Sequence, residues 1–308
     1  MIVVCGEALV DLVPVAVGGP YAARPGGSPA NVAVGLGRLG HEVTLLARLS
    51  EDPFGRLLRD HLTASTVDLA SAVTVAEPTT LAVVSLDERG QADYAFYVTG
   101  AADGGWDVGQ LPARLPPGAP LHVSGSLALA VPSMGAVVEA LLERERGGRV
   151  LALDPNVRPL LVSDEPGLRA RLDRWLGLVD LVKVSDEDLA WLCPGEPVED
   201  VAARWRERGP AVVVVTRGGE GVHALGPAGP VDLPALPVQV ADTVGAGDSF
   251  MGGLLAALSE RGLLGRPELD ALSSADLREA LAFAAQVAAV TCSRPGADPP
   301  WRAELPGP

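Results

Sequence analysis

The chain has 308 residues and a formal net charge of −15, with 48% hydrophobic and 20% charged residues. This composition is typical of a globular protein, and the length suits one large domain or two smaller ones. Nucleic acids and anionic membranes bind through clustered lysine and arginine, so the acidic balance disfavours both kinds of partner.

The cysteines and the N-terminal residues bear on the cellular compartment. Cys5, Cys193 and Cys292 are scattered and form no CxxC pair, which disfavours a disulfide framework or a zinc site. The first residues, "MIVVCGEALVD", have no basic start and reach Glu7 early, unlike a signal peptide. The uncharged stretch 123–138 is interrupted by a proline and polar residues, so it is too broken to span a bilayer. We therefore expect a cytoplasmic protein.

Short β-branched runs alternate with helical patterns along the chain. Strands are expected at 2–5, 43–48, 121–125, 149–154, 180–185 and 211–216. Helices are expected at 29–39, 54–65, 132–146, 165–176, 186–192, 198–208, 247–262 and 274–292. This alternation predicts a doubly wound, mostly parallel α/β sheet flanked by helices. The strands are almost wholly apolar, as strands covered on both faces should be.

Two segments break this alternation. Residues 9–25 and 79–98 read as strands joined by turns, and "LDERGQ" (86–91) is expected to be a hairpin turn. Strands that stand apart from a doubly wound sheet predict a small β-sheet lid, with an ordinary edge hairpin as the alternative. The chain shows no internal repeat or linker, so we expect a single domain over residues 1–308.

Several classes of phosphate and metal chemistry are excluded by motif. The only lysine, Lys183, does not follow a glycine loop, so there is no Walker P-loop, and the HRD, DFG and HExxH motifs are absent. "GLGRLG" (35–40) matches GxGxxG, but a helical pattern precedes it and a strand follows, the reverse of the dinucleotide fingerprint. Gly40 is then expected to cap that helix. The histidines are far apart in sequence and are interpreted as structural: His41, His61, His122 and His223.

The stretch "DTVGAGDSF" (242–250) carries the main chemical signal. Gly245, Ala246 and Gly247 would present backbone N–H groups to an anion at the start of a helix. Asp248 is a carboxylate beside that anion site. It fits a general base that takes a proton from an attacking hydroxyl while the N–H groups hold a transferred phosphoryl group. A simple helix N-cap is the alternative for Asp248.

Other segments place polar groups at strand ends or helix starts. "PGGSPANVA" brings Asn31 into a glycine-rich turn, and "GEALVDL" carries Asp11 toward the expected lid. "DPNVRP" places Arg158 just after a strand, and "TRGGEG" follows the strand at 211–216 with glycines that would admit a nucleotide. In open α/β sheets this carboxyl edge is where ligands bind.

Together these segments resemble the pfkB, or ribokinase-like, carbohydrate kinase family. "GGSPANVA" and "DTVGAGDSF" match its two signatures, and "KVSDEDL" and "TCSRPGA" extend the likeness along the whole chain. "DYAFYVTGAAD" (93–103) is most similar to the fructokinase branch. The resemblance implies a ribokinase-like sheet with a β-lid and transfer of the ATP γ-phosphoryl group to a primary hydroxyl of a sugar.

The resemblance also implies roles for single residues. The catalytic base would be Asp248, with the anion hole formed by Gly245, Ala246 and Gly247. The sugar-binding residues would be Asp11, Gly26, Gly27, Asn31, Tyr97 and Arg158. The nucleotide-binding residues would be Lys183, Ser185, Thr216, Gly218, Gly219, Gly221, Gly247 and Ala285.

The implied metal sites differ from the family pattern. The family's Asn-x-x-Glu motif, linked to Mg²⁺, is Ser-Asp-Glu-Asp here (185–188), which leaves Glu187 and Asp188 as the expected residues. The residues that resemble the monovalent-cation site, for K⁺, are Asp242, Val244 and Thr291. The family also allows a homodimer formed through the lid.

Fructose is the expected substrate, giving fructose 6-phosphate. Segment 93–103 has three aromatic residues and no basic one, which favours a neutral hexose. Val98 stands where fructokinases often have arginine, so 2-keto-3-deoxygluconate stays open as an alternative, with ribose or a nucleoside as further ones. A sensor that binds sugar or nucleotide without catalysis is the alternative from another class, although binding alone does not need a base at Asp248.

Overall fold

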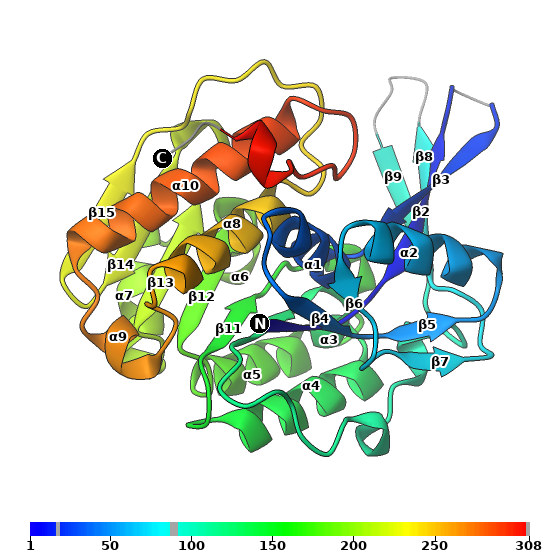
Figure 1. Cartoon of the computed structure of the whole chain (residues 1–308), viewed down its shortest axis with the longest axis horizontal. Helices are drawn as coiled ribbons and strands as arrows, with labels where there is room; N and C mark the ends of the chain where they lie inside the picture. The colour runs from blue at the N-terminus through cyan, green and yellow to red at the C-terminus, as the bar shows by residue number, and fades with distance from the viewer. Residues whose placement is uncertain (17–18, 87–91, 306–308) are drawn as a thin grey trace.

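The computed structural model describes residues 1–16, 19–86 and 92–305, and its main element is a nine-stranded sheet (Figure 1). The strand order is β15-β14-β13-β12-β11-β10-β1-β4-β6. The bounds of the strands are β1 Ile2–Cys5, β4 Val43–Leu46, β6 Val67–Asp68, β10 Leu121–Ser124, β11 Leu151–Asp154, β12 Leu181–Ser185, β13 Val212–Thr216, β14 Val222–Gly226 and β15 Gly229–Leu233. Strands from β6 to β13 pair in parallel, whereas β14 and β15 are antiparallel. The expected mostly parallel sheet is confirmed.

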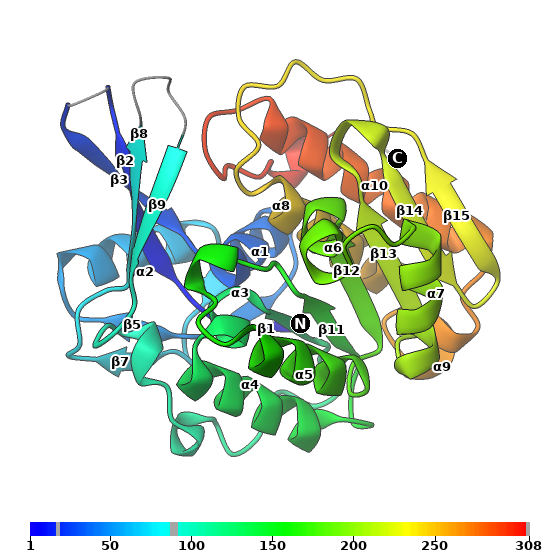
Figure 2. The ribbon, with the colours of Figure 1, turned by 180° about the vertical axis from the view of Figure 1, so that it is seen from behind.

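Helices cover both faces of this sheet (Figures 1 and 2). The helices on one face are α1 Ser28–Arg38, α2 Pro53–Ala64, α8 Ala246–Glu260, α9 Arg266–Asp270 and α10 Ser274–Cys292. The helices on the other face are α3 Ser126–Ala130, α4 Pro132–Glu145, α5 Glu165–Leu176, α6 Asp186–Leu192 and α7 Val198–Arg208.

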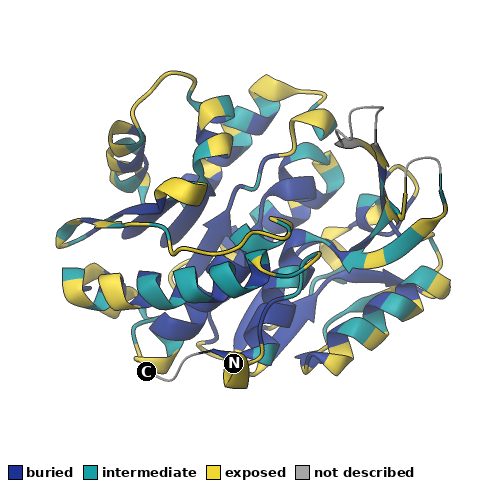
Figure 3. Ribbon diagram, turned by 90° about the horizontal axis from the view of Figure 1, so that it is seen from above, coloured by how far each residue is buried: buried dark blue, intermediate teal, exposed yellow. Residues whose placement is uncertain are grey.

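The two helical layers explain why the strands are apolar throughout. Successive side chains of a strand point to opposite faces, so each strand contributes side chains to the hydrophobic cores on both faces of the sheet. In β1, Val4 packs into the core under α1 and α8, whereas Val3 packs into the core under α3 and α4. Figure 3 shows the resulting pattern, with mostly buried strands at the centre of the molecule and helices in which exposed and intermediate residues alternate with buried ones.

A second, four-stranded sheet projects beside the first (Figure 1). Its strands are β2 Leu9–Pro14, β3 Tyr21–Gly26, β8 Leu81–Leu86 and β9 Ala92–Tyr97, in the order β3-β2-β8-β9. They come from the two segments that broke the βα alternation. The hairpin turn expected at 86–91 lies, beyond Leu86, outside the described residues.

Some elements differ from the predicted ones. The strand expected at 43–48 is two strands, because the chain leaves the main sheet after Leu46. Arg48–Ser50 (β5) pairs instead with Val73–Val75 (β7) in a separate two-stranded sheet. The hairpin β14–β15 and the short helices α3 and α9 were not expected. Gly40 has the predicted left-handed backbone, with φ of 89°, after α1.

The order of the strands defines where a ligand can enter. The chain runs from β1 outward to β4 and β6, and later strands from β10 to β13 build on the other side of β1. The direction in which successive strands are added to the sheet therefore reverses between β1 and β10. Such a switch point opens a crevice at the carboxyl ends of the strands. None of the helices in the described part of the chain has the length and apolar character that a membrane crossing requires.

Candidate active site

Asp248 lies in the first turn of α8, close to the switch point. The helix begins at Ala246 and its N-cap is Gly245, which has a left-handed φ of 75° and gives no side-chain cap. Asp248 is therefore the third residue of the helix, and its carboxylate makes no capping bond. The N-cap alternative for Asp248 is wrong, because the left-handed glycine starts the helix earlier than the sequence pattern indicated.

The Asp248 carboxylate instead contacts the start of α1. Ser28 Oγ donates to Asp248 Oδ1 at 2.6 Å, and Asn31 Nδ2 donates to Oδ2 at 2.9 Å. The helices α1 and α8 pack directly against each other, and a Cβ on Gly252 would be in ordinary contact with the Val32 carbonyl oxygen, at 3.5 Å. The structure thus brings together Asn31 and Asp248, which are 217 residues apart in sequence.

The expected anion loop is tightly constrained. A Cβ at Gly245 would lie 2.6 Å from the Cβ of Ala297, and a Cβ at Gly247 would lie 2.8 Å from Lys183 Nζ. The Ala246 N–H is turned back to the Thr243 carbonyl at 3.2 Å. The first-turn amides of a helix lack intrahelical acceptors, so those of Gly247 and Asp248 are available to an anion.

Lys183 places a positive charge beneath that loop. Its side chain is buried and its Nζ donates to Asp154 Oδ2 at 2.8 Å. Burial lowers the pKa of Lys183, but the carboxylates of Asp154, Asp248 and Asp188 together more than offset this and leave the pKa above its ordinary value. The ammonium is therefore charged and lies next to Gly247, where phosphate oxygens would arrive.

Asp11 and the glycine turn form the other end of the crevice. A Cβ at Gly26 would lie 2.1 Å from Asp11 Oδ2, so only glycine leaves that carboxylate its place. Gly27 has φ of 101° and caps α1. Burial raises the pKa of Asp11 to about 6, an effect that the positive charge of Arg158 partly counteracts. Arg158 is therefore close enough to Asp11 for its charge to act on that carboxylate.

The register of the lid distinguishes its aromatic residues. Asp11 is level with Ala82 on β8, which is level with Phe96 on β9. Directly paired residues share a face of a sheet, so Phe96 is on the face of Asp11. Tyr97 is one residue further along, points to the opposite face and is 61% exposed. Phe96 and Asp11 therefore share one face of the four-stranded sheet, and Tyr97 lies on the other face.

Several residues expected to bind the nucleotide lie at or just after the carboxyl ends of β12 and β13. Ser185 and Thr216 end the adjacent strands β12 and β13, and Ser185 Oγ caps α6 by accepting from the Asp188 N–H at 3.0 Å. Gly218 and Gly219 form an open turn, since added Cβ atoms would meet nothing within 4 Å. Gly221 has a structural reason to be glycine, with φ of 97° and the Leu233 carbonyl only 2.0 Å from an added Cβ. Ala285 is half-buried on α10, which packs against β15.

The residues expected near metal ions differ in their exposure and in the hydrogen bonds that they already make. Asp188 is buried and accepts from the Val157 N–H at 3.0 Å, whereas Glu187 is exposed. Asp242 holds its own loop by accepting from Val244 N–H at 3.0 Å and Gly296 N–H at 2.8 Å. Over the described ranges, no group of three acidic, histidine or cysteine side chains is arranged to hold a metal ion.

The Thr291 hydroxyl is also engaged within the protein. Its Oγ1 lies 2.8 Å from Ser249 Oγ and 3.1 Å from the Val287 carbonyl oxygen. Thr291 is fully buried in the last turn of α10, next to the loop that Asp242 closes. For Val244 and Thr291, only their backbone carbonyl groups would therefore be candidates for binding a cation.

Sequence reasoning did not single out several buried polar residues at this site. Asp154 holds Lys183, and Ser28 holds Asp248. Among the described residues, the carboxyl groups of Glu7 and Asp103 are buried without a hydrogen bond of normal geometry. Burial raises their pKa values to about 7 and about 8, although contacts with Ser126 and Thr80 oppose the shifts. Their positions after β1 and just after β9 at the root of the lid were visible in the sequence, but their burial was not.

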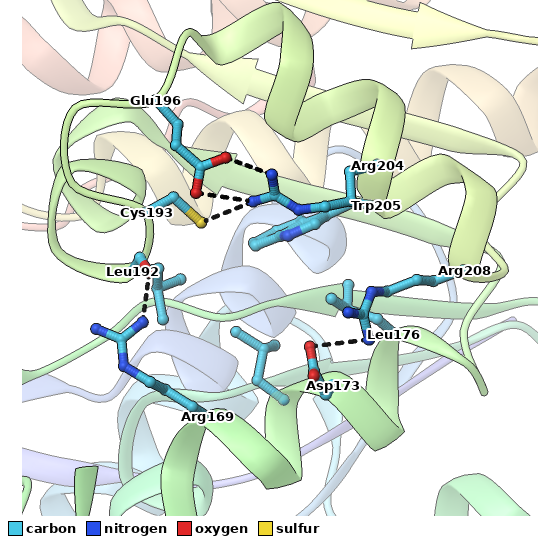
Figure 4. A pocket seen from close by; sticks show the side chains of 10 residues that line it. Arg169, Asp173, Leu176, Leu192, Cys193, Glu196, Arg204, Trp205 and Arg208 are labelled. Atoms are coloured by element: carbon cyan, nitrogen blue, oxygen red, sulfur yellow. Dashed lines mark hydrogen bonds and ion pairs between the residues drawn. The ribbon is translucent and has the colours of Figure 1, made fainter. Parts of the chain in front are cut away.

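A second pocket lies away from this edge, between α5 and α7 (Figure 4). Its arginines are already paired: Arg208 contacts Asp173 at 3.0 Å, and Arg204 is bonded to Glu196. None of the residues expected at the active site lines this pocket. It is therefore separate from the crevice at the strand ends.

A carboxylate and an amide-lined loop on one helical turn can deprotonate a hydroxyl while stabilising a transferred phosphoryl group. Here that turn sits at the switch point of a doubly wound sheet, with a small separate sheet carrying Asp11 beside it. This is the ribokinase-like arrangement, and the class of protein that it defines is a kinase acting on a hydroxyl.

Comparisons with known proteins identify the family within this class. The profile of the pfkB family carbohydrate kinases matches residues 1–304. A fructokinase from Rhizobium leguminosarum bv. trifolii is 39% identical over 284 residues, covering 90% of this chain and 86% of the relative. The chain therefore belongs to the pfkB family of carbohydrate kinases and is a phosphotransferase.

Solved structures agree with this assignment. A fructokinase from Xylella fastidiosa with bound ATP matches with a TM-score of 0.88 at 27% identity, covering 99% of this chain and 94% of that one. A fructokinase from Vibrio cholerae O395 bound to fructose, ADP and a calcium ion matches with a TM-score of 0.83 at 32% identity, covering 96% and 94%.

Proposed function

We propose that this carbohydrate kinase transfers the γ-phosphoryl group of ATP to the primary hydroxyl of fructose and forms fructose 6-phosphate. The observation that carries the proposal is the position of Asp248, which joins the amide-lined loop of α8 to the glycine turn of α1. The named fructokinases among its relatives support fructose as the acceptor.

In this reaction the protein makes no covalent bond to the substrate. Asp11 accepts hydrogen bonds from the sugar hydroxyls, and Asn31 donates hydrogen bonds to them. Asp248 takes the proton of the hydroxyl that attacks phosphorus. The amides at the start of α8, Lys183 and Arg158 balance the charge of the phosphoryl group in transit. The four-stranded sheet serves as a lid that excludes water, with Phe96 on its sugar side.

A sugar acid is the second candidate substrate, and Arg24 is the observation that favours it. Arg24 on β3 is directly paired with Asp11, so both side chains share a face of the lid. A guanidinium there is well shaped to hold the carboxylate of 2-keto-3-deoxygluconate. Sequence reasoning considered Arg158 and segment 93–103, which has no basic residue, and missed Arg24.

A coupled assay of ADP release with a panel of sugars tests these assignments. We expect fructose to give the highest kcat/KM among fructose, 2-keto-3-deoxygluconate, ribose, tagatose and adenosine. A preference for 2-keto-3-deoxygluconate of about tenfold or more, or about 1.4 kcal/mol, would replace fructose as the substrate. Arg24→Ala should then abolish that preference and should leave activity on fructose within about threefold. ADP release with none of the sugars would overturn the proposed activity.

The affinity for fructose should fall in mild acid. Because burial raises the pKa of Asp11 to about 6, this carboxylate becomes protonated and stops accepting two hydroxyl bonds as the pH falls through that value. Titration calorimetry should give a Kd that is constant above about pH 7 and about tenfold higher at pH 5. Asp11→Ala should bind fructose about ten- to hundred-fold more weakly at neutral pH and should lose this pH dependence. An unchanged Kd in the variant would show that Asp11 does not contact the sugar.

Magnesium and potassium are part of the proposal. ATP would enter as its Mg²⁺ complex, with Glu187 the accessible carboxylate near the phosphates and Asp188 holding the adjoining loop. K⁺ would bind at backbone carbonyls of Val244 and Thr291 near Asp242. Omitting each ion in turn from the assay tests its role.

We also propose a homodimer formed through the lid and a location in the cytoplasm. Several large apolar side chains of the lid are exposed, among them Val15, Tyr21 and Tyr97, and a second copy of this sheet would cover them. Sedimentation velocity at two concentrations would detect the dimer. The three cysteines, all within the described ranges, are free thiols, which suits a reducing compartment.

A further inference from the structure

A chain of hydrogen bonds leads from the Asp248 carboxylate into the core. Ser28 Oγ donates to Asp248 Oδ1 at 2.6 Å and lies 2.9 Å from Ser124 Oγ. Ser124 Oγ in turn lies 3.3 Å from His122 Nε2. Ser28 is 5% exposed, and Ser124 and His122 are fully buried, so no solvent replaces these contacts. The four residues come from α8, α1 and β10, which meet at the switch point of the sheet.

Counting protons fixes the direction of this chain. Asp248 must be ionised to act as a base, so its Oδ1 only accepts and the single proton of Ser28 points at it. The hydroxyl proton of Ser124 must then lie between the two serines. Ser124 has no proton left for His122, so His122 must donate from Nε2 to Ser124. Every donor in the chain therefore points toward the catalytic carboxylate.

The surroundings of His122 agree with this direction. Burial lowers the pKa of His122 to about 3, with the charge of Lys183 adding to the effect, so the ring is neutral and carries one proton. The Ala152 backbone opposes this lowering of the pKa, but neither it nor any other described residue makes a hydrogen bond of normal geometry to Nδ1. A bare lone pair is the cheaper group to bury without a partner, because a buried N–H without an acceptor is rarer in proteins. The proton therefore belongs on Nε2.

We infer that Ser28, Ser124 and His122 are positioning residues for the catalytic base. They hold Asp248 Oδ1 in place, which leaves Oδ2 to receive the proton of the sugar hydroxyl when the sugar displaces the Asn31 contact. The inference rests on the proposed role of Asp248 and adds three residues that act through it. Of these three residues, Ser28 should have the largest effect on the base, because it is the one that contacts the Asp248 carboxylate directly.

Other charged groups face Asp248 and stay unchanged when this chain is altered. They are Glu7 after β1, Asp11 on β2, Asp154 on β11 and Lys183 on β12. Removing the Ser28 hydroxyl adds or removes no charge, and Glu7, Asp11 and Asp154 titrate in the wild type and the variant alike, so the difference between the two pH profiles reports on Asp248.

Ser28→Ala should lower kcat by about tenfold or more and leave the KM for fructose and ATP within about threefold, because a misplaced base affects the transition state alone. A carboxylate that loses a donor takes up a proton more readily, so the acid limb of the kcat profile should move to higher pH. Ser124→Ala should lower kcat by less. The double variant should be no slower than Ser28→Ala, because Ser124 acts only through Ser28.

Ser65→Ala is the matched control. Ser65 is equally buried and accepts a hydrogen bond from Arg38 at the opposite end of α1, about 15 Å from Ser28 along the helix. Its kcat and pH profile should match those of the wild type, and thermal unfolding of all variants would separate loss of fold from loss of positioning. Unchanged kcat in Ser28→Ala, or multiplying effects in the double variant, would overturn the inference.

Nitrogen NMR of ¹⁵N-histidine-labelled protein tests the direction of the chain without an activity assay. His122 should be in the Nε2–H form across neutral pH, with its signals identified by their loss in His122→Gln. The Nδ1–H form would overturn the proposed direction. If the wild type is active and Ser28→Ala has an unchanged kcat, only this inference is contradicted. If Asp248→Asn is active, the underlying role of Asp248 is contradicted.

Discussion

Asp248→Asn is expected to lower kcat by at least about 10²-fold, because an amide cannot take the proton of the attacking hydroxyl. Binding should be nearly unchanged, since the Asn carbonyl oxygen can still accept from Ser28 in the place of Oδ1. Asn31 can turn its own amide so that it accepts from the new NH₂ group. Steady-state kinetics and calorimetric titration with fructose and ATP would measure the two effects separately.

Stability offers a check on this result. Asp248 does not cap α8, so its replacement removes no bond to the helix backbone, and thermal unfolding should be little changed. Asp164→Asn is a suitable control, since Asp164 is a true N-cap on α5 and accepts from the Gly167 N–H at 3.0 Å. Asparagine caps as well as aspartate, so that variant should keep full activity. Near-normal turnover in Asp248→Asn would remove Asp248 from the role of base.

The strand ends and glycine turns of the site could be predicted from the sequence because their chemistry is local. The adjacent residues Gly245 to Asp248 are enough to indicate that a helix with an anion site begins there. The fold also followed from local pattern, since βα alternation with apolar strands permits few arrangements. The family was visible for the same reason, because its signatures are short and continuous.

What could not be predicted depends on pairing between distant segments. The contact between Ser28 and Asp248 spans 220 residues, and His122 was interpreted as structural because nothing near it in sequence indicates a catalytic neighbour. The choice between Phe96 and Tyr97 depends on the register between β8 and β9, where a shift of one residue exchanges the two faces. The N-cap alternative for Asp248 is wrong because Gly245 has a left-handed backbone and caps the helix itself, a conformation that the sequence allows but does not specify.

Breaking the ion pair between Lys183 and Asp154 should cause the largest loss of stability among these variants. Both side chains are almost fully buried, 4% and 1% exposed, and Lys183 Nζ is 2.8 Å from Asp154 Oδ2. Lys183→Met would leave the aspartate charge without its partner inside the protein. The free energy of unfolding should fall by about 3–5 kcal/mol, measured as a lower midpoint of urea unfolding.

Replacing both members of the pair should separate its two roles. The variant Lys183→Met with Asp154→Leu buries no charge, so it should recover most of the stability that the single variant loses. Its activity should not recover, because Lys183 Nζ lies 2.8 Å from where a Cβ on Gly247 would be, directly beneath the phosphate loop. Without that positive charge, kcat should fall at least about tenfold even in a stable protein. A double variant that is both stable and fully active would mean that Lys183 only neutralises Asp154, and that the amides of α8 and Arg158 suffice for the phosphoryl group.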